Sequence, residues 1–312
     1  MKDLSCYIEN HKFIPVICGP TASGKSSLAL KLCEEENGEL VSCDSMQIYK
    51  GLDIGTAKDT AEEQQRIKHH MIDIVDPDVN YSVNDYVTDA LKCIEEILKR
   101  GKLPVLCGGT GQYISALVKG LDFGSEEVSD KTVSELYAEY ERDGINDIYN
   151  RLSKVDPEAA ENIHPNNVRR VIRAYAVFVD TGITFTEKNR RSELNGPEYP
   201  FRLFLLQWPR EELYSRINDR VDEMVSSGLV DEAQWLYSSY GSSGSTSLQA
   251  IGYKELFPYL NGDISLDRAV YEIKLNTRHY AKRQMTWFRK MDVYYINMPE
   301  KNKLTDKWYD LS

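Results

Sequence analysis

The stretch Gly19–Ser26, GPTASGKS, constrains the fold of this chain more than any other part of the sequence. It matches the pattern G-x-x-x-x-G-K-[ST], in which both glycines, the lysine and the serine hold fixed positions. The apolar run Phe13–Cys18 comes directly before it, and a helical pattern over residues 25–36 overlaps its end. Strand, loop and helix in this order are the context that the motif requires. The sequence therefore predicts an α/β domain with a phosphate-binding loop.

Each part of this loop has a physical role in holding an anion. Glycines let the backbone turn its N–H groups toward one point, the next helix adds the positive end of its dipole, and Lys25 adds a full charge. Ser26 is the expected protein ligand of a Mg²⁺ ion. The predicted oligophosphate site comprises Gly19, Pro20, Thr21, Ala22, Ser23, Gly24, Lys25 and Ser26.

The loop alone does not identify the phosphate compound or the bond that breaks. ATP is the compound that the motif suggests first, and a kinase or triphosphatase usually carries a Mg²⁺-side aspartate at a strand end. The candidate strand Lys102–Gly109 ends in two glycines instead. An acid stands at the end of a different predicted strand, at Asp44.

Short apolar runs alternate with helical patterns through the first 120 residues, which predicts a parallel sheet flanked by helices. One helix is expected over Asn84–Gly101, where apolar residues recur at helical spacing and the glycine supplies the stop. The expected strands are Phe13–Cys18, Glu39–Asp44, His70–Val75 and Lys102–Gly109.

A purely helical pattern interrupts this alternation. From about Leu121 to Pro200 the strand signals are absent, and Asp156 with Pro157 is a typical helix start. The strand pattern resumes at Phe201–Trp208, and a short strand is expected near the end, at VYYIN. The sequence thus predicts a P-loop α/β core formed by residues 1–120 and 201–312, with residues 121–200 inserted as an all-helical domain.

Composition and charge narrow the class of protein. The chain is 41% hydrophobic and 28% charged, which is ordinary for a globular protein, and no apolar run is long enough to span a membrane. Its net charge of −11 argues against indiscriminate coating of nucleic acid but not against a local basic surface. The N-terminus lacks a secretory pattern and the six cysteines lack metal spacing, so we expect a cytoplasmic chain with reduced thiols. Nothing in the sequence requires more than a monomer.

Asp44 lies at the end of a predicted parallel strand, and ligands of open parallel sheets bind beyond the carboxyl ends of the strands. We therefore expect its carboxylate on the same rim as the phosphate loop. From the spacing alone, Asp44 could hold Mg²⁺, cap the next helix or act as a general base, and capping and chemistry are equally supported.

Eight strings occur in a fixed order between about Phe13 and Lys290: GPTASGKS, DSMQIYKGLDIGTAK, HHMIDIVDP, YSVNDY, CGGTGQY, IHPNNVRRVIRA, AIGYKE and AKRQMTWFRK. Together they closely resemble the bacterial tRNA dimethylallyltransferases, the isopentenyl-transferase family. The resemblance covers nearly the whole chain.

The resemblance implies transfer of a dimethylallyl group from its diphosphate to the exocyclic amine of an adenosine beside the anticodon of tRNA. The loop would then hold the diphosphate of dimethylallyl diphosphate, with Lys25, Ser26 and Mg²⁺ stabilising the leaving group. Asp44 matches the catalytic aspartate that accepts the proton of the amine, and Thr110 matches a threonine near the bridging oxygen. Asp44, Ser45, Met46 and Gln47 match the string that contacts the adenine.

Two basic segments match strings that contact tRNA in the family. From Ile273 to Met291 the chain carries six Lys or Arg residues and no acid. A charge run is most often a solvated helix face, but one-sided charge together with the resemblance favours RNA contact. The residues implied in tRNA binding are Arg169, Arg170, Val171, Ile172, Arg173, Lys282, Arg283, Gln284, Trp287 and Arg289.

The chain departs from the family pattern at one place. The family commonly carries an arginine about twenty residues after the GGT threonine, where this chain reads FGSEEVSDKTV. Lys131 could substitute for it, or the role could be absent. His69 and His70 are given no catalytic role, because adjacent histidines at a strand start are usually hydrogen-bonded or exposed.

Three other functions remain open on the sequence. Transfer to free AMP, ADP or ATP would need neither the helical insertion nor the basic C-terminal helix. A small-molecule kinase would lack its strand-end aspartate. An RNA-binding module without chemistry would not depend on Asp44.

Overall fold

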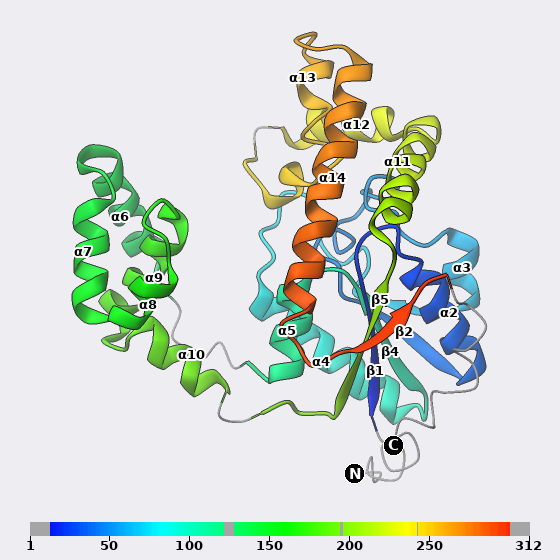
Figure 1. Cartoon of the computed structure of the whole chain (residues 1–312), viewed down its shortest axis with the longest axis horizontal. Coiled ribbons are helices and arrows are strands. Elements are labelled where there is room, and N and C mark those ends of the chain that lie inside the picture. The colour runs from blue at the N-terminus through cyan, green and yellow to red at the C-terminus, as the bar shows by residue number, and fades with distance from the viewer. Residues whose placement is uncertain (1–12, 122–127, 194–195, 242, 300–312) are drawn as a thin grey trace. The chain divides into compact units, whose positions relative to one another are not determined.

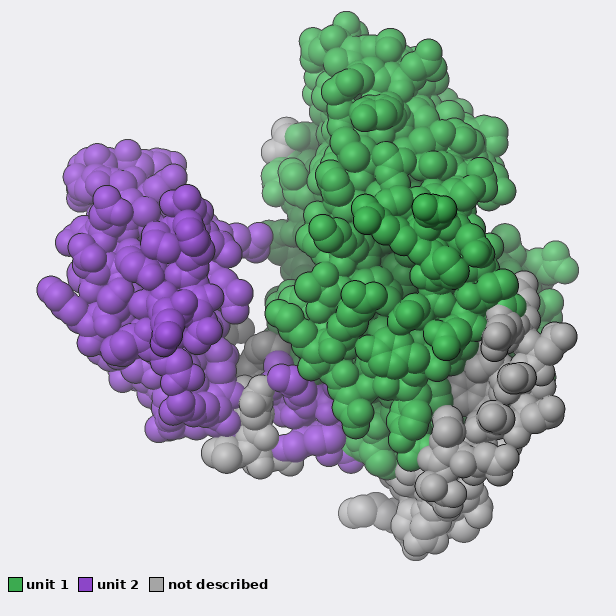
Figure 2. Space-filling view, viewed as in Figure 1, with its two compact units in different colours: residues 1–116, 199–312 green, residues 117–198 purple. Residues whose placement is uncertain are grey.

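The computed structural model describes residues 13–121, 128–193, 196–241 and 243–299 of the 312-residue chain. The chain divides into two compact units, coloured separately in Figure 2. The sheet unit comprises residues 1–116 and 199–312, and the helical unit comprises residues 117–198. The sequence patterns placed the insertion at 121–200. Its expected contact with tRNA stays a prediction.

The sheet unit is built on six parallel strands in the order β3-β2-β4-β1-β5-β6 (Figure 1). This confirms the predicted parallel sheet. Because the strands are parallel, the ends of β1, β2 and β4 lie at one edge. The strands are β1 Ile14–Cys18, β2 Gly38–Ser42, β3 His69–His70, β4 Leu103–Gly108, β5 Phe201–Gln207 and β6 Tyr294–Asn297.

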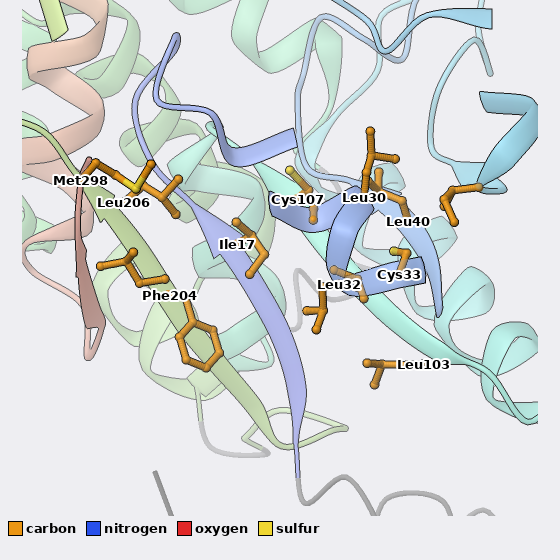
Figure 3. Close-up of a cluster of buried hydrophobic side chains, with 14 residues drawn as sticks. Ile17, Leu30, Leu32, Cys33, Leu40, Leu103, Cys107, Phe204, Leu206 and Met298 are labelled. Carbon is orange, nitrogen blue, oxygen red and sulfur yellow. The ribbon is translucent and has the colours of Figure 1, made fainter. Parts of the chain in front are cut away.

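Helix α2, Lys25–Glu35, packs its apolar side on one face of the sheet (Figure 3). Leu30 and Leu32 meet strand residues such as Ile17 there, and each such burial contributes about 1.5–3 kcal/mol. Strand residues that point the other way, Val16 and Leu106 among them, are also fully buried. Both faces of the sheet are therefore covered, as parallel sheets require.

Helix α4, Val83–Lys99, contacts β2 and β4 and agrees with the helix predicted over residues 84–101. Ser82 begins it with a capping box to Asp85. Gly101 follows it with φ 69°, a left-handed conformation that favours glycine.

The strand predicted at His70–Val75 is wrong beyond its first residue. Met71 and Asp73 have φ of 62° and 54°, which an extended strand does not allow. The chain leaves the sheet there because the N–H groups of Asp73 and Ile74 donate to the carbonyls of Gln47 and Ile48. These long-range contacts override the local strand preference.

The rest of the sheet unit is mostly helical, and α14 crosses it as the longest element in Figure 1. A second core cluster joins these helices to the segment after β2, with Tyr49, Leu229 and Tyr253 among its buried members. The elements are α3 Ala61–Arg66, α5 Gly111–Lys119 at the unit boundary, α11 Arg210–Ser226, α12 Leu229–Tyr240, the 3-10 helix Thr246–Gln249, α13 Phe257–Leu260 and α14 Leu266–Phe288.

The helical unit has a core of its own, formed by residues such as Leu136, Ile148 and Val171. The predicted helix start at Asp156 and Pro157 is confirmed, since the Asp156 carboxylate accepts the N–H of Ala159 at 3.0 Å. The helices of this unit are α6 Asp130–Asp143, α7 Asn146–Val155, α8 Pro157–Asn162, α9 Val168–Thr181 and α10 Phe185–Glu193.

Across the described parts of the chain, none of the helices combines the length and the apolarity that a membrane crossing needs. Five of the cysteines carry free thiols, and Cys6 lies outside the described residues. Burial raises the pKa of Cys33 and of Cys43 to about 12, so these thiols stay protonated at neutral pH.

Candidate active site

A cavity of about 700 Å³ opens in the sheet unit beside the ends of β2 and β4. This size is within the usual range for small-ligand sites. The phosphate loop, the segment after β2 and the loop Gly55–Asp59 line it, together with α11, residues 249–254 and α14.

The phosphate loop has the conformation that its glycines predict. Gly24 has φ 86° and stands as N-cap of α2, and Ala22 is also left-handed at φ 61°. The first N–H groups of α2 have no partner within the helix, and they lie at the cavity with Lys25 and Ser26. This arrangement is that of an anion site at a helix N-terminus.

Side chains from distant parts of the chain hold this loop in place. Trp208 Nε1 donates to the Ser23 carbonyl at 2.9 Å, and Arg216 Nε donates to the Ala22 carbonyl at 2.8 Å. Gln284 Oε1 accepts the N–H of Thr21 at 3.0 Å. The loop is therefore pre-organised, but the N–H of Thr21 is occupied by Gln284.

Two of the predicted loop ligands need qualification. Ser23 is fully buried and its hydroxyl is directed at Gly19, so its side chain does not reach a ligand in the cavity. Gly19 has φ 159°, an extended backbone that any residue can adopt. A side chain at this position is restricted because the Ser23 hydroxyl lies close to it.

Lys25 carries the positive charge expected of the loop, with Nζ 3.5 Å from the Pro20 carbonyl. Burial lowers its pKa, and Arg220 adds to this, while the charges of Asp44 and Asp59 oppose it. A diphosphate in the cavity would stabilise the charged form of Lys25.

Oxygen ligands suited to Mg²⁺ are present in the cavity lining. Ser26, Asp44 and Asp59 all line the cavity. No group of three or more His, Cys, Asp or Glu side chains among the described residues could hold a metal by itself. Mg²⁺ usually keeps waters and binds phosphate oxygens beside one or two protein oxygens, which these residues suit.

Asp44 follows β2, and the structure shows its capping role, while the role as general base stays a prediction. Its Oδ1 accepts the N–H of Met46 at 2.9 Å and so caps the turn. Within the described part of the chain no donor is recorded on Oδ2, which leaves that oxygen for a ligand in the cavity.

Thr110 ties the end of β4 to the end of β2. Its Oγ1 accepts the N–H of Ser45 at 2.9 Å, and its own N–H donates to the Cys43 carbonyl at 3.1 Å. Thr110 is therefore bonded to both neighbours of Asp44, and the positions of the two predicted catalytic residues are coupled.

Sequence reasoning missed several polar residues of the cavity. Arg216 and Arg220 stand four residues apart on α11, beside the apolar residues Ile217 and Val221 that also face the cavity. Burial lowers the pKa of Arg220, although Asp44 and Asp59 oppose this, and a guanidinium stays charged in any case. The spacing of two arginines along an apolar helix face is the signal that could have identified them.

Tyr280 on α14 is a further cavity residue that sequence reasoning missed. Burial, followed by the charge of Asp44, raises its pKa, although hydrogen bonds with Thr110 and Gln284 oppose the shift. The hydroxyl therefore stays protonated beside Thr110.

The predicted adenine-contacting string Asp44–Gln47 lines the cavity, as expected. The carboxamide of Gln47 is held on both sides: Nε2 donates to the carbonyls of Thr56 and Ala57 at 3.2 Å each, and Oε1 accepts from Ser42 Oγ at 2.8 Å. One lone pair of Oε1 remains for a ligand.

The predicted basic surface on α14 is only partly exposed. Lys282, Arg283 and Arg289 are exposed, and Trp287 is 45% exposed with Nε1 bonded to Ser115 at 2.7 Å. Gln284 is 5% exposed and bonds the phosphate loop and the Gly109 carbonyl, so its side chain supports the cavity and is not free to bind RNA.

In the helical unit, Arg169, Arg170 and Arg173 are exposed on α9. Val171 and Ile172 are fully buried in the core of that unit. Their side chains cannot contact tRNA, so that part of the sequence prediction is corrected. They face inward because their spacing puts them on the apolar side of α9.

The structure also places Lys131 and the two adjacent histidines. Lys131 lies exposed on α6 in the helical unit, beside Glu135, and its substitution for the missing arginine stays a prediction; the residues before 128 in that stretch lie outside the described residues. Both histidines are hydrogen-bonded: His69 Nε2 to Asp59 at 3.0 Å and His70 Nε2 to Glu39 at 2.6 Å.

The fold and the cavity define a P-loop-type α/β protein in which the glycine-rich loop and a strand-end carboxylate line one cavity. The family model described as IPP transferase matches residues 47–291, and the chain belongs to this family.

Relatives and solved structures agree along most of the chain. A tRNA dimethylallyltransferase of Acetivibrio thermocellus is 47% identical over 286 residues, covering 91% of each chain. The crystal structure of the tRNA isopentenylpyrophosphate transferase from Bacillus halodurans is 44% identical, with a TM-score of 0.68 over 92% of this chain and 90% of that one. A eukaryotic dimethylallyltransferase acting on tRNA is 34% identical, with a TM-score of 0.80 over 91% of this chain and 73% of that one.

Proposed function

We propose that the chain transfers a dimethylallyl group from dimethylallyl diphosphate to the exocyclic amine of the adenosine 3′-adjacent to the anticodon in tRNA, releasing diphosphate. The observation that carries this proposal is the pairing of Asp44 and the phosphate loop in one cavity, with no recorded donor on Asp44 Oδ2 among the described residues. The names of the relatives, which are tRNA dimethylallyltransferases at this level of identity, support the same reaction.

The chemistry divides between the two sides of the cavity. The amine nitrogen attacks the allylic carbon, the bond from that carbon to the bridging oxygen breaks, and the diphosphate leaves. The adenine amine is a weak nucleophile, and Asp44 takes its proton as the new bond forms. Lys25, Arg220 and the N–H groups at the start of α2 line the cavity and would stabilise the charge on the diphosphate. For Thr110 we keep the role near the bridging oxygen that the family resemblance implies; its hydroxyl contacts Ser45 Oγ at 3.3 Å.

Magnesium would add a further charge on the leaving-group side. Ser26 would hold it together with the diphosphate oxygens, and Asp44 or Asp59 could orient its waters. The ion would supply electrostatic stabilisation of the departing diphosphate.

The tRNA side is proposed on the exposed cations. Lys282, Arg283 and Arg289 on and after α14 would contact phosphates, and exposed Trp287 offers a ring for stacking. The arginines of α9 would contact the same RNA. One copy of the chain supplies every group named here, and the proposal keeps the cytoplasmic location expected from the sequence.

The test is transfer of radiolabelled dimethylallyl groups to unmodified tRNA and, in parallel, to free AMP. Wild-type protein should label tRNA only. Asp44→Ala should lose about a hundredfold or more of the rate, because general-base contributions are of that size. Its binding of dimethylallyl diphosphate should persist.

Label on AMP would show that the acceptor is a free nucleotide and not tRNA. Label on neither would refute the proposal and direct the test to ATP turnover. An Asp44→Ala protein as active as wild type would support the proposed reaction but refute the role of Asp44 as its general base.

A further inference from the structure

The loop Gly51–Lys58 forms a wall of the cavity and orients the side chain expected to meet the adenine. Gly55, Thr56 and Ala57 line the cavity. The carbonyls of Thr56 and Ala57 accept both hydrogens of Gln47 Nε2, which fixes which end of the carboxamide is nitrogen. The orientation of Gln47 thus depends on where this loop lies.

One carboxylate outside the loop holds its backbone. Glu232, in the first turn of α12, accepts the N–H groups of three consecutive loop residues: Asp53 at 3.0 Å and Ile54 at 2.9 Å on Oε2, and Gly55 at 2.9 Å on Oε1. Three successive N–H groups converging on one anion form a backbone nest. Glu232 fills it from a position 177 to 179 residues away in the sequence.

Tyr253 completes the attachment from a third segment. It is fully buried, and its hydroxyl donates to Glu232 Oε1 at 2.6 Å. An added Cβ at Gly55 would lie 2.5 Å from the Tyr253 ring, so the loop backbone rests directly on that ring. Tyr253 belongs to the second cavity-lining segment, residues 249–254, and Glu232 therefore joins two walls of the cavity.

Lys58 ties the far end of the loop to Asp53 at its near end and to the segment before it. Lys58, whose side chain is 2% exposed, donates to the Tyr49 carbonyl at 2.7 Å and to Asp53 at 2.7 Å, and pairs with Asp73. Glu232 and Lys58 thus hold the two ends of a loop whose middle bonds Gln47.

We propose that Glu232 is a positioning residue for the acceptor adenosine. It acts through the loop Asp53–Ala57 on Gln47, and the inference rests on the proposed function. The phosphate loop is held by other side chains, those of Trp208, Arg216 and Gln284. Loss of Glu232 should therefore impair use of the acceptor and spare binding of the donor.

The test uses Glu232→Gln, which places an NH2 group against N–H donors, in the full-length protein. Asp231→Asn is the matched control, because it removes a charge from the same first turn of α12. Amide hydrogen exchange should accelerate by about tenfold at residues 53–55 in Glu232→Gln and stay unchanged in the control. This readout needs no substrate.

Steady-state kinetics then test the role in the reaction. For Glu232→Gln we expect kcat/KM for tRNA to fall by about ten- to a hundredfold, since small misplacements of reacting groups cost that much. The KM for dimethylallyl diphosphate should stay within about twofold. In a Gln47→Ala background the same substitution should cost little more, because the two residues act in one chain of contacts.

Unchanged amide hydrogen exchange at residues 53–55 in Glu232→Gln would overturn the proposal. An equal loss of kcat/KM for tRNA and for dimethylallyl diphosphate would also overturn it, as would fully additive effects of Glu232→Gln and Gln47→Ala. If Glu232→Gln fails to fold, Tyr253→Phe keeps the ring beneath Gly55 and removes one donor, and it should show a smaller shift with the same substrate preference. Wild-type protein that labels no tRNA would refute the proposed function before any variant is compared, and the inference would fall with it.

Discussion

At Gly108, the last residue of β4, the backbone lies against Cys43, the residue that follows β2, without room for a side chain. An added Cβ would lie 2.2 Å from the Cys43 carbonyl oxygen and 2.4 Å from its carbon. Cys43 precedes Asp44, and Gly108 stands two residues before Thr110. The absence of one carbon atom therefore lets the two predicted catalytic residues approach each other.

Gly108→Ala should lower the free energy of unfolding by about 2–3 kcal/mol, because a backbone atom cannot move aside as a flexible side chain can. Transfer activity should fall as well, since the shift displaces Asp44. Urea denaturation measures the first effect and the label assay the second.

Gly101→Ala is the comparison for this substitution. Its Cβ would meet open space, and only the left-handed backbone, at φ 69°, opposes it, by about 1 kcal/mol. Equal urea midpoints for Gly108→Ala and wild type would show that β2 can move away from β4 freely.

Four elements of the sheet unit meet at one buried charge, Glu39 of β2, which is 2% exposed. His70 of β3, Arg100 after α4 and Lys102 before β4 contact its carboxylate at 2.6, 2.6 and 3.1 Å. Burial raises the pKa of Glu39, but hydrogen bonds from Arg100, His70 and Lys102 outweigh it, and the pKa is lowered to about 2. Burial lowers the pKa of His70, although Glu39 opposes this.

Both shifts make the fold less stable in acid. The unfolded chain takes up a proton at His70 first, as pH falls through about 6.5, and at Glu39 next, between about 4.5 and 2. The stability due to Glu39 is complete above pH 4.5 and is lost by about pH 2, which corresponds to about 3 kcal/mol.

Glu39→Gln should therefore flatten the dependence of unfolding free energy on pH between 5 and 3, measured by urea denaturation at each pH. Exposed Glu62, replaced by Gln, is the control and should keep the wild-type slope. A slope in Glu39→Gln as steep as that of wild type would assign the acid sensitivity to other carboxylates.

At the scale of the whole molecule, the chain enters and leaves the helical unit side by side. An added Cβ at Gly120 would lie 1.9 Å from the Gly196 carbonyl oxygen, and both glycines have positive φ. Since the unit also has its own core, its removal need not disturb the sheet.

A variant in which Gly120 is joined directly to Gly196 should bind dimethylallyl diphosphate like wild type and lose about a hundredfold or more in transfer to tRNA. Isothermal titration with the donor and the label assay measure the two properties. Loss of donor binding would mean that the insertion supports the cavity.

A milder variant separates loss of the unit from loss of its charge. Arg169→Ala, Arg170→Ala and Arg173→Ala together should raise the KM for tRNA and make its salt dependence shallower, by up to about one power of salt concentration per arginine. An unchanged salt dependence would place the RNA contacts elsewhere.

Much of this protein was predictable because its signals are local. The glycines and lysine of the phosphate loop, the start of α8 at Asp156 and the alternation of strands and helices all depend on residues close together in sequence. The wrong strand at His70–Val75 and the misassigned side chain of Gln284 depend on partners far away. No local pattern reports that Gln284 would bond Thr21 across 263 positions.

The sequence by itself determined the class of fold, the anion-binding loop and the carboxylate at the sheet edge, because backbone propensity and periodicity act over a few residues. Only the tertiary structure decided what surrounds the site: the arginines of α11, the contact of Gly108 with Cys43, and the hydrogen bonds from the loop beside Gln47 to Glu232. Those arrangements come from packing and hydrogen bonds between distant segments, which form only when the chain has folded.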